Sequence, residues 1–318
     1  MHKRKLGRSG LWVSEIAFGG VEIGVPYGIG VTSAADMPTE AESIELVQCA
    51  IDNGINFFDT ARQYGRSEEI IGKAVRQQRE KVILCTKSAH LAGENGRLPG
   101  NAEVKQLIMT SLEASLHALQ TDTIDLFMLH DADPKVFMHA GITDVFQECK
   151  ERGLIRSCGV STYQVSETQS AIEHGSWDVI QLPFNLMDQR HGALLDTAEK
   201  AGVGIVVRSV LLKGVLSDRG QNLHPSLRDI QIHRERYLEL LDEKTPTLSM
   251  LATRFALAFP QVAAVLVGID RLAYLQQALA AATGSALANE KVKKAQSLAF
   301  PNPEFIDLPH WARMGWLT

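Results

Sequence analysis

The sequence predicts an α/β fold in which eight parallel strands close into a (β/α)8 TIM barrel. Short runs of β-branched and aromatic residues recur eight times, separated by segments whose apolar residues have helical spacing. Glycines follow several helical segments, and the first strand is not followed by a GxGxxG motif. These 318 residues suffice for one such barrel, so we expect a single domain over 1–318.

The predicted strands and helices alternate along the chain. The strands are expected at 15–18, 56–59, 82–86, 124–129, 157–160, 179–181, 204–208 and 264–267. Helices are expected around 44–51, 70–75 and 107–119, and at 144–152, 166–174, 193–201, 248–258 and 272–282. This alternation is typical of repeated strand and helix units around a parallel sheet.

Four segments lie outside the eightfold pattern. The N-terminus is expected to form two short extended pieces that turn at 8–10, and residues 214–244 form an extra stretch. The loop 21–38 is expected to shape the substrate pocket, because barrels carry specificity in such loops. The tail from Pro301 contains Trp311 and Trp316, which either fold over the barrel mouth or pack on its outside.

Composition and charge exclude several classes of protein. The chain is 45% hydrophobic and 22% charged with a net charge of −5, which argues against disorder and against a nucleic-acid partner. The basic start lacks the apolar run of a secretory signal, and no apolar stretch could span a bilayer, so we expect a cytoplasmic protein. Its four cysteines lack metal-type spacing, so we expect free thiols and no metal site. The oligomeric state stays open.

Four ionisable residues follow strands at the rim where barrel enzymes place their chemistry. Asp59 ends the second predicted strand, in NFFD, and Tyr64 lies five residues later. Lys87 follows the third strand in VILCTK, and His130 follows the fourth in DLFMLH. Each alone has an ordinary structural explanation. Together they predict a site, because a lysine and a histidine after such apolar strands are costly to bury unless paired.

Such a set suits the reduction of a carbonyl group, which requires a hydride and a proton. A tyrosine donates that proton readily only if its pKa, about 10 when unperturbed, moves toward neutrality. We expect the ammonium of Lys87 to lower the pKa of Tyr64, and Asp59 to keep Lys87 charged. His130 would donate a hydrogen bond to the substrate oxygen. These four residues are the predicted catalytic set.

The motifs that carry these residues resemble those of the aldo-keto reductase superfamily. The resemblance covers nearly the whole chain and rests on DTARQYG (59–65), ILCTK, DLFMLH, GLIRSCGVS (153–161) and VIQLPFN (179–185). It implies an NAD(P)(H)-dependent oxidoreductase that interconverts an aldehyde or ketone and its alcohol. The cofactor would lie extended across the barrel mouth, with Tyr64 as the general acid.

The resemblance also implies cofactor contacts. Ser161 and Gln181 would hold the nicotinamide carboxamide, beside Thr162, where the family usually has asparagine. Arg208 stands where an aromatic ring usually stacks on the nicotinamide, and a planar guanidinium also stacks on rings. The expected pyrophosphate contacts are Ser209, Leu211 and Lys213.

The eighth unit bears on the choice of nucleotide. Gly268, Asp270 and Tyr274 are expected at the adenosine end of the cofactor, and Gly20 in the first loop replaces a commoner threonine. A carboxylate at Asp270 suits a free ribose hydroxyl better than a 2′-phosphate, so the sequence favours NAD(H). The neighbouring Arg271 leaves NADP(H) open.

Two other functions remain possible from the sequence. The chain also resembles the potassium-channel β subunits, which would make it a cofactor-binding regulatory subunit. Alternatively, Lys87 as a neutral amine could form a Schiff base in a lyase, although Asp59 would keep it protonated. The substrate is a small molecule, and Arg62, Arg190 and His191 near the predicted rim favour a hydroxylated or sugar-like carbonyl. The direction of the reaction stays open.

Overall fold

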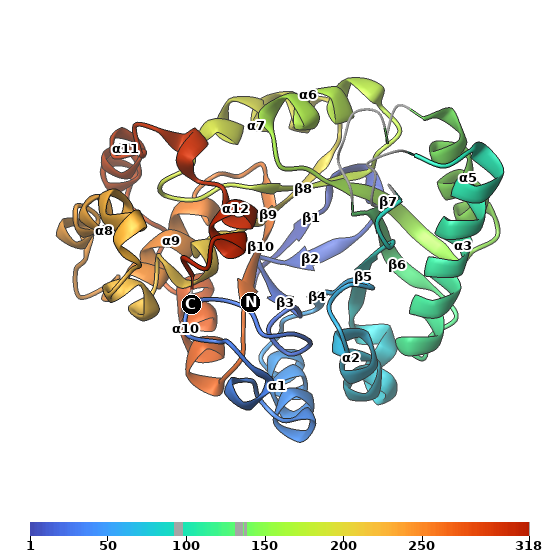
Figure 1. The fold of residues 1–318 in the computed structure, drawn as a ribbon, viewed down its shortest axis with the longest axis horizontal. Coiled ribbons are helices and arrows are strands. Elements are labelled where there is room, and N and C mark those ends of the chain that lie inside the picture. The colour runs from blue at the N-terminus through green and yellow to red at the C-terminus, as the bar shows by residue number, and fades with distance from the viewer. Residues whose placement is uncertain (92–97, 131–135, 137–138, 318) are drawn as a thin grey trace.

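The computed structural model describes residues 1–91, 98–130, 136 and 139–317. In that part of the chain, eight parallel strands form a closed barrel in the order β10-β3-β4-β5-β6-β7-β8-β9 (Figure 1). The strands are β3 (Ile16–Gly19), β4 (Phe57–Asp59), β5 (Ile83–Lys87), β6 (Ile124–Leu129), β7 (Ile155–Ser161), β8 (Val179–Pro183), β9 (Gly204–Arg208) and β10 (Val262–Gly268). Each overlaps one predicted strand, so the (β/α)8 prediction is confirmed.

Helices cover the outer face of the barrel between successive strands (Figure 1). They are α1 (Glu40–Asp52), α2 (Ser67–Val75), α3 (Asn101–Ala118), α5 (Ala140–Glu151), α6 (Val165–His174), α7 (Leu195–Lys200), α9 (Leu248–Leu257) and α10 (Leu272–Thr283). A local signal explains where α1 begins, because Thr39 and Glu42 form a reciprocal capping box with the backbone. None of the helices in the described residues is both long and apolar enough to cross a lipid bilayer.

The alternation of side chains along each strand decides which residues enter the barrel. Phe57 belongs to the apolar cluster inside the barrel, whereas Phe58 belongs to the layer between strands and helices. Ile83 and Cys85 are likewise inside, and Leu84 is outside. Because strand side chains alternate with a period of two, the same alternation turns the last residue of both β4 and β5 toward the barrel interior.

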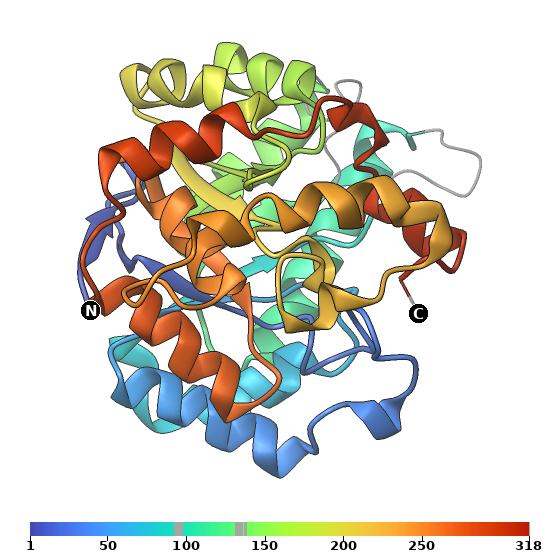
Figure 2. The same cartoon turned by 90° about the vertical axis from the view of Figure 1, so that its left-hand side faces the viewer.

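A two-stranded hairpin closes one end of the barrel. β1 (Lys3–Lys5) pairs antiparallel with β2 (Trp12–Ser14), and the chain turns at Gly7–Ser9, as predicted. Leu6, Leu11 and Val13 of this hairpin pack into the interior cluster. Figure 2 shows the hairpin at one end of the barrel and the C-terminal tail at the opposite end.

The 214–244 segment contains α8 (Arg228–Glu235), the tail contains α12 (Leu308–Arg313), and α11 (Asn289–Ser297), which was not predicted, follows α10. Trp311 is fully buried and donates its indole N–H to the backbone oxygen of Phe305. Trp316 stacks on His224 of the 214–244 segment. The two tryptophans thus pack within the tail and on that segment, and neither lines the groove described below.

Leu126 tests how far stability depends on the barrel interior. We expect Leu126→Ala to lower the free energy of unfolding by about 2–5 kcal/mol, because its side chain is fully buried inside the barrel. The matched control is Leu107→Ala on α3, since Leu107 is 38% exposed. Chemical denaturation measures both variants, and equal losses would contradict the assigned core.

Candidate active site

A buried ion pair lies at the carboxyl ends of β4 and β5. Lys87 is fully buried, and its Nζ donates to Oδ2 of Asp59 at 2.6 Å and to the backbone oxygen of Thr60 at 2.9 Å. Gln181 of β8 donates its side-chain amide to Oδ1 of Asp59 at 2.8 Å. Burial lowers the pKa of Lys87, but Asp59 together with Tyr64 and Cys85 outweighs this effect, so the pKa lies above its ordinary value. Lys87 is therefore an ammonium.

Tyr64 lies directly over this pair. Lys87 Nζ is 4.9 Å from the centroid of the Tyr64 ring, and the ring meets His130 edge to face with 5.8 Å between centroids. The turn that carries Tyr64 is held by a close backbone approach, because a β-carbon at Gly24 would collide with the Tyr64 carbonyl oxygen. Gly65 has φ +53°, and a β-carbon added there would collide with the Gly24 carbonyl oxygen. The 21–38 loop therefore packs directly on the turn that carries Tyr64.

The pKa of Tyr64 differs from the expectation. Burial raises the pKa of Tyr64, Lys87 lowers it by a smaller amount and Asp59 raises it further, so the net pKa lies above its ordinary value. The predicted shift toward neutrality is therefore wrong for this site, because burial outweighs the effect of Lys87 and Asp59 adds to the effect of burial. Tyr64 is held as a neutral phenol, which is the proton-donating form.

His130 is neutral as well. Burial, together with the positive charge of Lys87, lowers the pKa of His130 to about 2. Its ring is stacked between the edge of Tyr64 and the ring of His90, whose centroid lies 5.0 Å away. A neutral imidazole retains one N–H, so His130 can donate a hydrogen bond without carrying charge.

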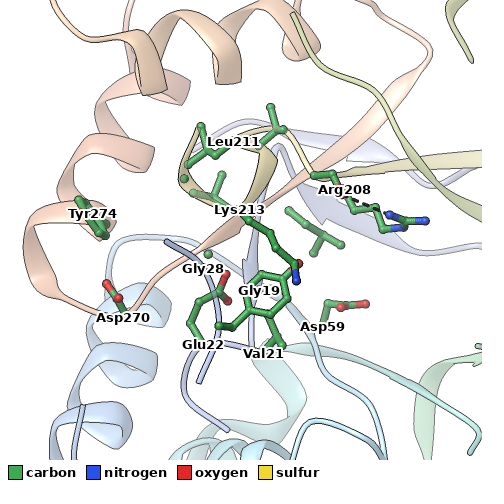
Figure 3. A pocket seen from close by; sticks show the side chains of 18 of the residues that line it. Gly19, Val21, Glu22, Gly28, Asp59, Arg208, Leu211, Lys213, Asp270 and Tyr274 are labelled. Atoms are coloured by element: carbon green, nitrogen blue, oxygen red, sulfur yellow. Dashed lines mark hydrogen bonds between the residues drawn. The ribbon is translucent and has the colours of Figure 1, made fainter. Parts of the chain in front are cut away.

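A groove runs from these residues to the ends of β9 and β10 (Figure 3). All but one of the residues predicted to bind the cofactor line it: Gly20, Ser161, Gln181, Arg208, Ser209, Leu211, Lys213, Gly268, Asp270 and Tyr274. The exception is Thr162, whose hydroxyl is buried against Thr168 at 2.7 Å on the α6 side. Lys87 lies below the groove surface.

Arg208 is held at the groove wall. Its guanidinium lies 4.1 Å from the ring centroid of Tyr163 and donates to the Thr162 carbonyl oxygen at 2.6 Å. Its Nε is buried and has no hydrogen-bond partner among the described residues. The segment after Arg208 is strained, because Ser209 and Lys213 adopt positive φ without being glycine.

Two arginines meet the carboxylate at the far end of the groove. Asp270 accepts from Arg219 at 2.5 Å and from Arg271 at 3.1 Å. Both guanidinium groups also lie within 5.2 Å of the Tyr274 ring centroid. Arg219 comes from the 214–244 segment, so this segment, as well as the eighth unit, builds the far end of the groove.

Sequence reasoning missed several groove residues. Glu22 and Gly28 of the 21–38 loop, Tyr163 after β7, and Arg219 all line the groove, while His90 stacks on His130. Their only sequence signal was a position in loops that leave the carboxyl ends of strands. The rim residues Arg62, Arg190 and His191 do not line it: Arg62 pairs with Glu68, and Arg190 pairs with Asp188.

A closed parallel barrel with ionisable residues gathered at its carboxyl end defines the class of barrel enzymes. The Aldo/keto reductase family model matches residues 15–299, and the chain belongs to this family of oxidoreductases. The uncharacterized oxidoreductase YqkF of Bacillus subtilis (strain 168) is 30% identical over 93% of this chain and 96% of its own.

Two further proteins resemble the chain over most of its length. L-galactose dehydrogenase from Arabidopsis thaliana is 26% identical, with 88% of each chain covered. The solved holo structure of aldo-keto reductase AKR11C1 from Bacillus halodurans has a TM-score of 0.77 at 27% identity, covering 94% of this chain and 96% of that one.

Proposed function

We propose that the protein is an NAD(P)(H)-dependent oxidoreductase that interconverts an aldehyde or ketone and its alcohol, with Tyr64 as the proton donor. The observation that carries this proposal is the position of the Lys87 ammonium, 4.9 Å from the Tyr64 ring centroid and ion-paired with Asp59 beneath the groove. His130 packs against the same phenol ring. Membership of an oxidoreductase family supports the same reaction class.

The groove has the chemistry to hold a dinucleotide. Lys213 lines it and makes no ion pair among the described residues, so its charge is available for a phosphate. Gly20 and Gly268 bring backbone to the groove surface without side chains. The buried, unpaired Nε of Arg208 and the flat Tyr163–Arg208 stack suit an aromatic ring with polar substituents.

Each residue of the site has a separate role in the proposed reaction. A bound nicotinamide supplies the hydride in the reductive direction. His130 donates a hydrogen bond that orients the carbonyl oxygen next to Tyr64, and Tyr64 gives its phenolic proton to that oxygen as charge develops there. The Lys87 ammonium stabilises the resulting phenolate, while Asp59 and Gln181 hold the ammonium in place.

The two alternative functions fare differently. A Schiff base on Lys87 requires a neutral, accessible amine, whereas Lys87 is fully buried, ion-paired and held as an ammonium. A regulatory subunit that only binds the cofactor would show a negligible steady-state rate of carbonyl reduction, whereas the proposed enzyme would turn over. A sugar-like substrate is supported by the relative named L-galactose dehydrogenase, rather than by the rim residues, since Arg62 and Arg190 are engaged elsewhere.

Removing the Tyr64 hydroxyl tests the assigned proton donor. We expect Tyr64→Phe to lower kcat for carbonyl reduction by about 10²–10⁴, the usual contribution of a general acid, while the cofactor Kd stays nearly unchanged. Tyr237→Phe is the matched control, because that hydroxyl is buried in the core and donates to backbone oxygens. A Tyr64→Phe enzyme with wild-type turnover would refute the assignment.

For the nucleotide, we propose a preference for NAD(H) over NADP(H). Asp270 lines the groove, and its carboxylate already forms ion pairs with Arg219 and Arg271. A 2′-phosphate there would have to compete with that carboxylate for both guanidinium groups, whereas a ribose hydroxyl could donate to it.

Neutralising Asp270 tests this preference. In Asp270→Asn, Arg219 and Arg271 lose their counter-ion, so we expect the Kd for NADPH to fall about tenfold relative to that for NADH. Fluorescence titration with each reduced nucleotide measures the ratio, and Asp229→Asn on the exposed side of α8 is the control. A wild-type preference for NADPH, or an unchanged ratio in the variant, would contradict the proposal.

A further inference from the structure

Glu22 occupies the middle of the groove. The 21–38 loop carries it across the end of β10, where a β-carbon added to Gly268 would collide with its Oε1. Figure 3 shows Glu22 between Asp59 on the catalytic side and Asp270 on the far side, with Lys213 nearby. A dinucleotide that extends along the groove must therefore pass this carboxyl group.

The loop that carries Glu22 is fastened on both sides of the groove. Gly24 packs on the Tyr64 turn, and Ile29 donates its backbone N–H to the Lys213 carbonyl oxygen at 2.9 Å. Tyr27, between these points, lies under the Lys213 ammonium with 4.5 Å from Nζ to the ring centroid. Glu22 thus lies between Gly20, whose backbone N–H donates to the Asp59 carbonyl oxygen at 2.8 Å, and the close contact at Gly24.

The surroundings of Glu22 disfavour a negative charge. Its Oε2 is buried and has no hydrogen-bond partner among the described residues. Asp59 faces it from β4, Asp270 from the turn after β10, and Tyr27 from its own loop. Of the two nearby cations, Arg219 is paired with Asp270, and Lys213 lies over the ring of Tyr27. No ion pair within the described residues neutralises Glu22.

Burial, reinforced by Asp270 and Asp59 and partly offset by a hydrogen bond with the residue's own backbone and by Arg219, raises the pKa of Glu22 to about 8. Above that pH the groove contains an extra carboxylate, and below it a neutral carboxylic acid. Because a dinucleotide brings a doubly negative pyrophosphate into the same groove, the neutral form binds it better, by Coulomb repulsion and by the hydrogen bond that a carboxylic acid donates.

We propose that Glu22 is a cofactor-binding residue that acts as a neutral carboxylic acid, so that each dinucleotide bound in the groove takes up one proton onto Glu22 at alkaline pH. The protonated carboxyl donates its O–H to a pyrophosphate oxygen, next to the ammonium of Lys213. This inference rests on the proposed function, since it requires that the groove bind a nicotinamide dinucleotide.

The test compares NADH and NADPH affinity in wild type and Glu22→Gln. Proton linkage predicts that the wild-type Kd rises about 30-fold from about pH 6.5 to about pH 9.5 through Glu22. Glu22→Gln, which keeps an N–H donor and cannot ionise, should lack that rise. Burial lowers the pKa of Lys213 and Glu22 raises it, so the comparison is repeated in a Lys213→Met background, where a difference between the two proteins comes from Glu22 and not from Lys213.

Calorimetry gives a readout that does not depend on turnover. At about pH 9, titrations in two buffers of different ionisation heat should show uptake of nearly one more proton per nucleotide by wild type than by Glu22→Gln. Glu45→Gln is the matched control, because Glu45 is an exposed carboxyl on α1 and its removal changes the net charge equally.

The outcomes separate the inference from the proposed function. A pH-dependent wild type with a flatter Glu22→Gln profile supports the inference. Tight binding with the same pH profile in both proteins overturns the inference and leaves the proposed function intact. Failure of wild type to bind either nucleotide even at about pH 6.5, where Glu22 is neutral, overturns the proposed function and the inference with it.

Discussion

The ion pair between Lys87 and Asp59 is the contact on which the rest of the site depends. An ammonium with no exposed surface persists only if its charge is compensated, and here a carboxylate at 2.6 Å and a backbone oxygen compensate it. In the proposed reaction the pair stabilises the negative charge that Tyr64 acquires when it gives up its proton, because Lys87 Nζ lies 4.9 Å from the centroid of that ring. Burial, with a smaller contribution from Asp59, outweighs the effect of Lys87 on the pKa of Tyr64, so the resting phenol keeps its proton.

The barrel explains why these groups meet. Phe57 and Asp59 share one face of β4, and Ile83, Cys85 and Lys87 share one face of β5, so the alternation that buries the apolar residues also turns Asp59 and Lys87 into the barrel. The hairpin at the opposite end fills the bottom of the barrel with Leu6, Leu11 and Val13. The polar groups therefore lie directly above the packed apolar interior of the barrel. Electrostatic interactions are stronger in such a low-dielectric environment than in water.

Strand order, helix positions and the gathering of the four ionisable residues at one end of the barrel could be predicted because each depends on local patterns. These patterns are alternating apolar residues, helical spacing, and polar residues at strand ends. The net pKa of Tyr64 could not, because it depends on opposing effects of burial and two charges. Glu22 and Arg219 were missed because loop residues acquire a role only when distant segments meet, as the 21–38 loop and the 214–244 segment do in the groove. The prediction that Arg62 and Arg190 lie at the substrate site was wrong for the same reason, because their ion pairs with Glu68 and Asp188 are visible only in the folded chain.

The most direct test of this account is the titration of the Tyr64 phenol itself, followed by NMR of ¹³C-labelled tyrosine and assigned by loss of the signal in Tyr64→Phe. In wild type the pKa should lie above the ordinary value of about 10. In Lys87→Met, which removes the cation beneath the ring, it should lie higher still. A Tyr64 pKa that is unchanged or lower in Lys87→Met would show that the lysine does not stabilise the phenolate, and the account would fail.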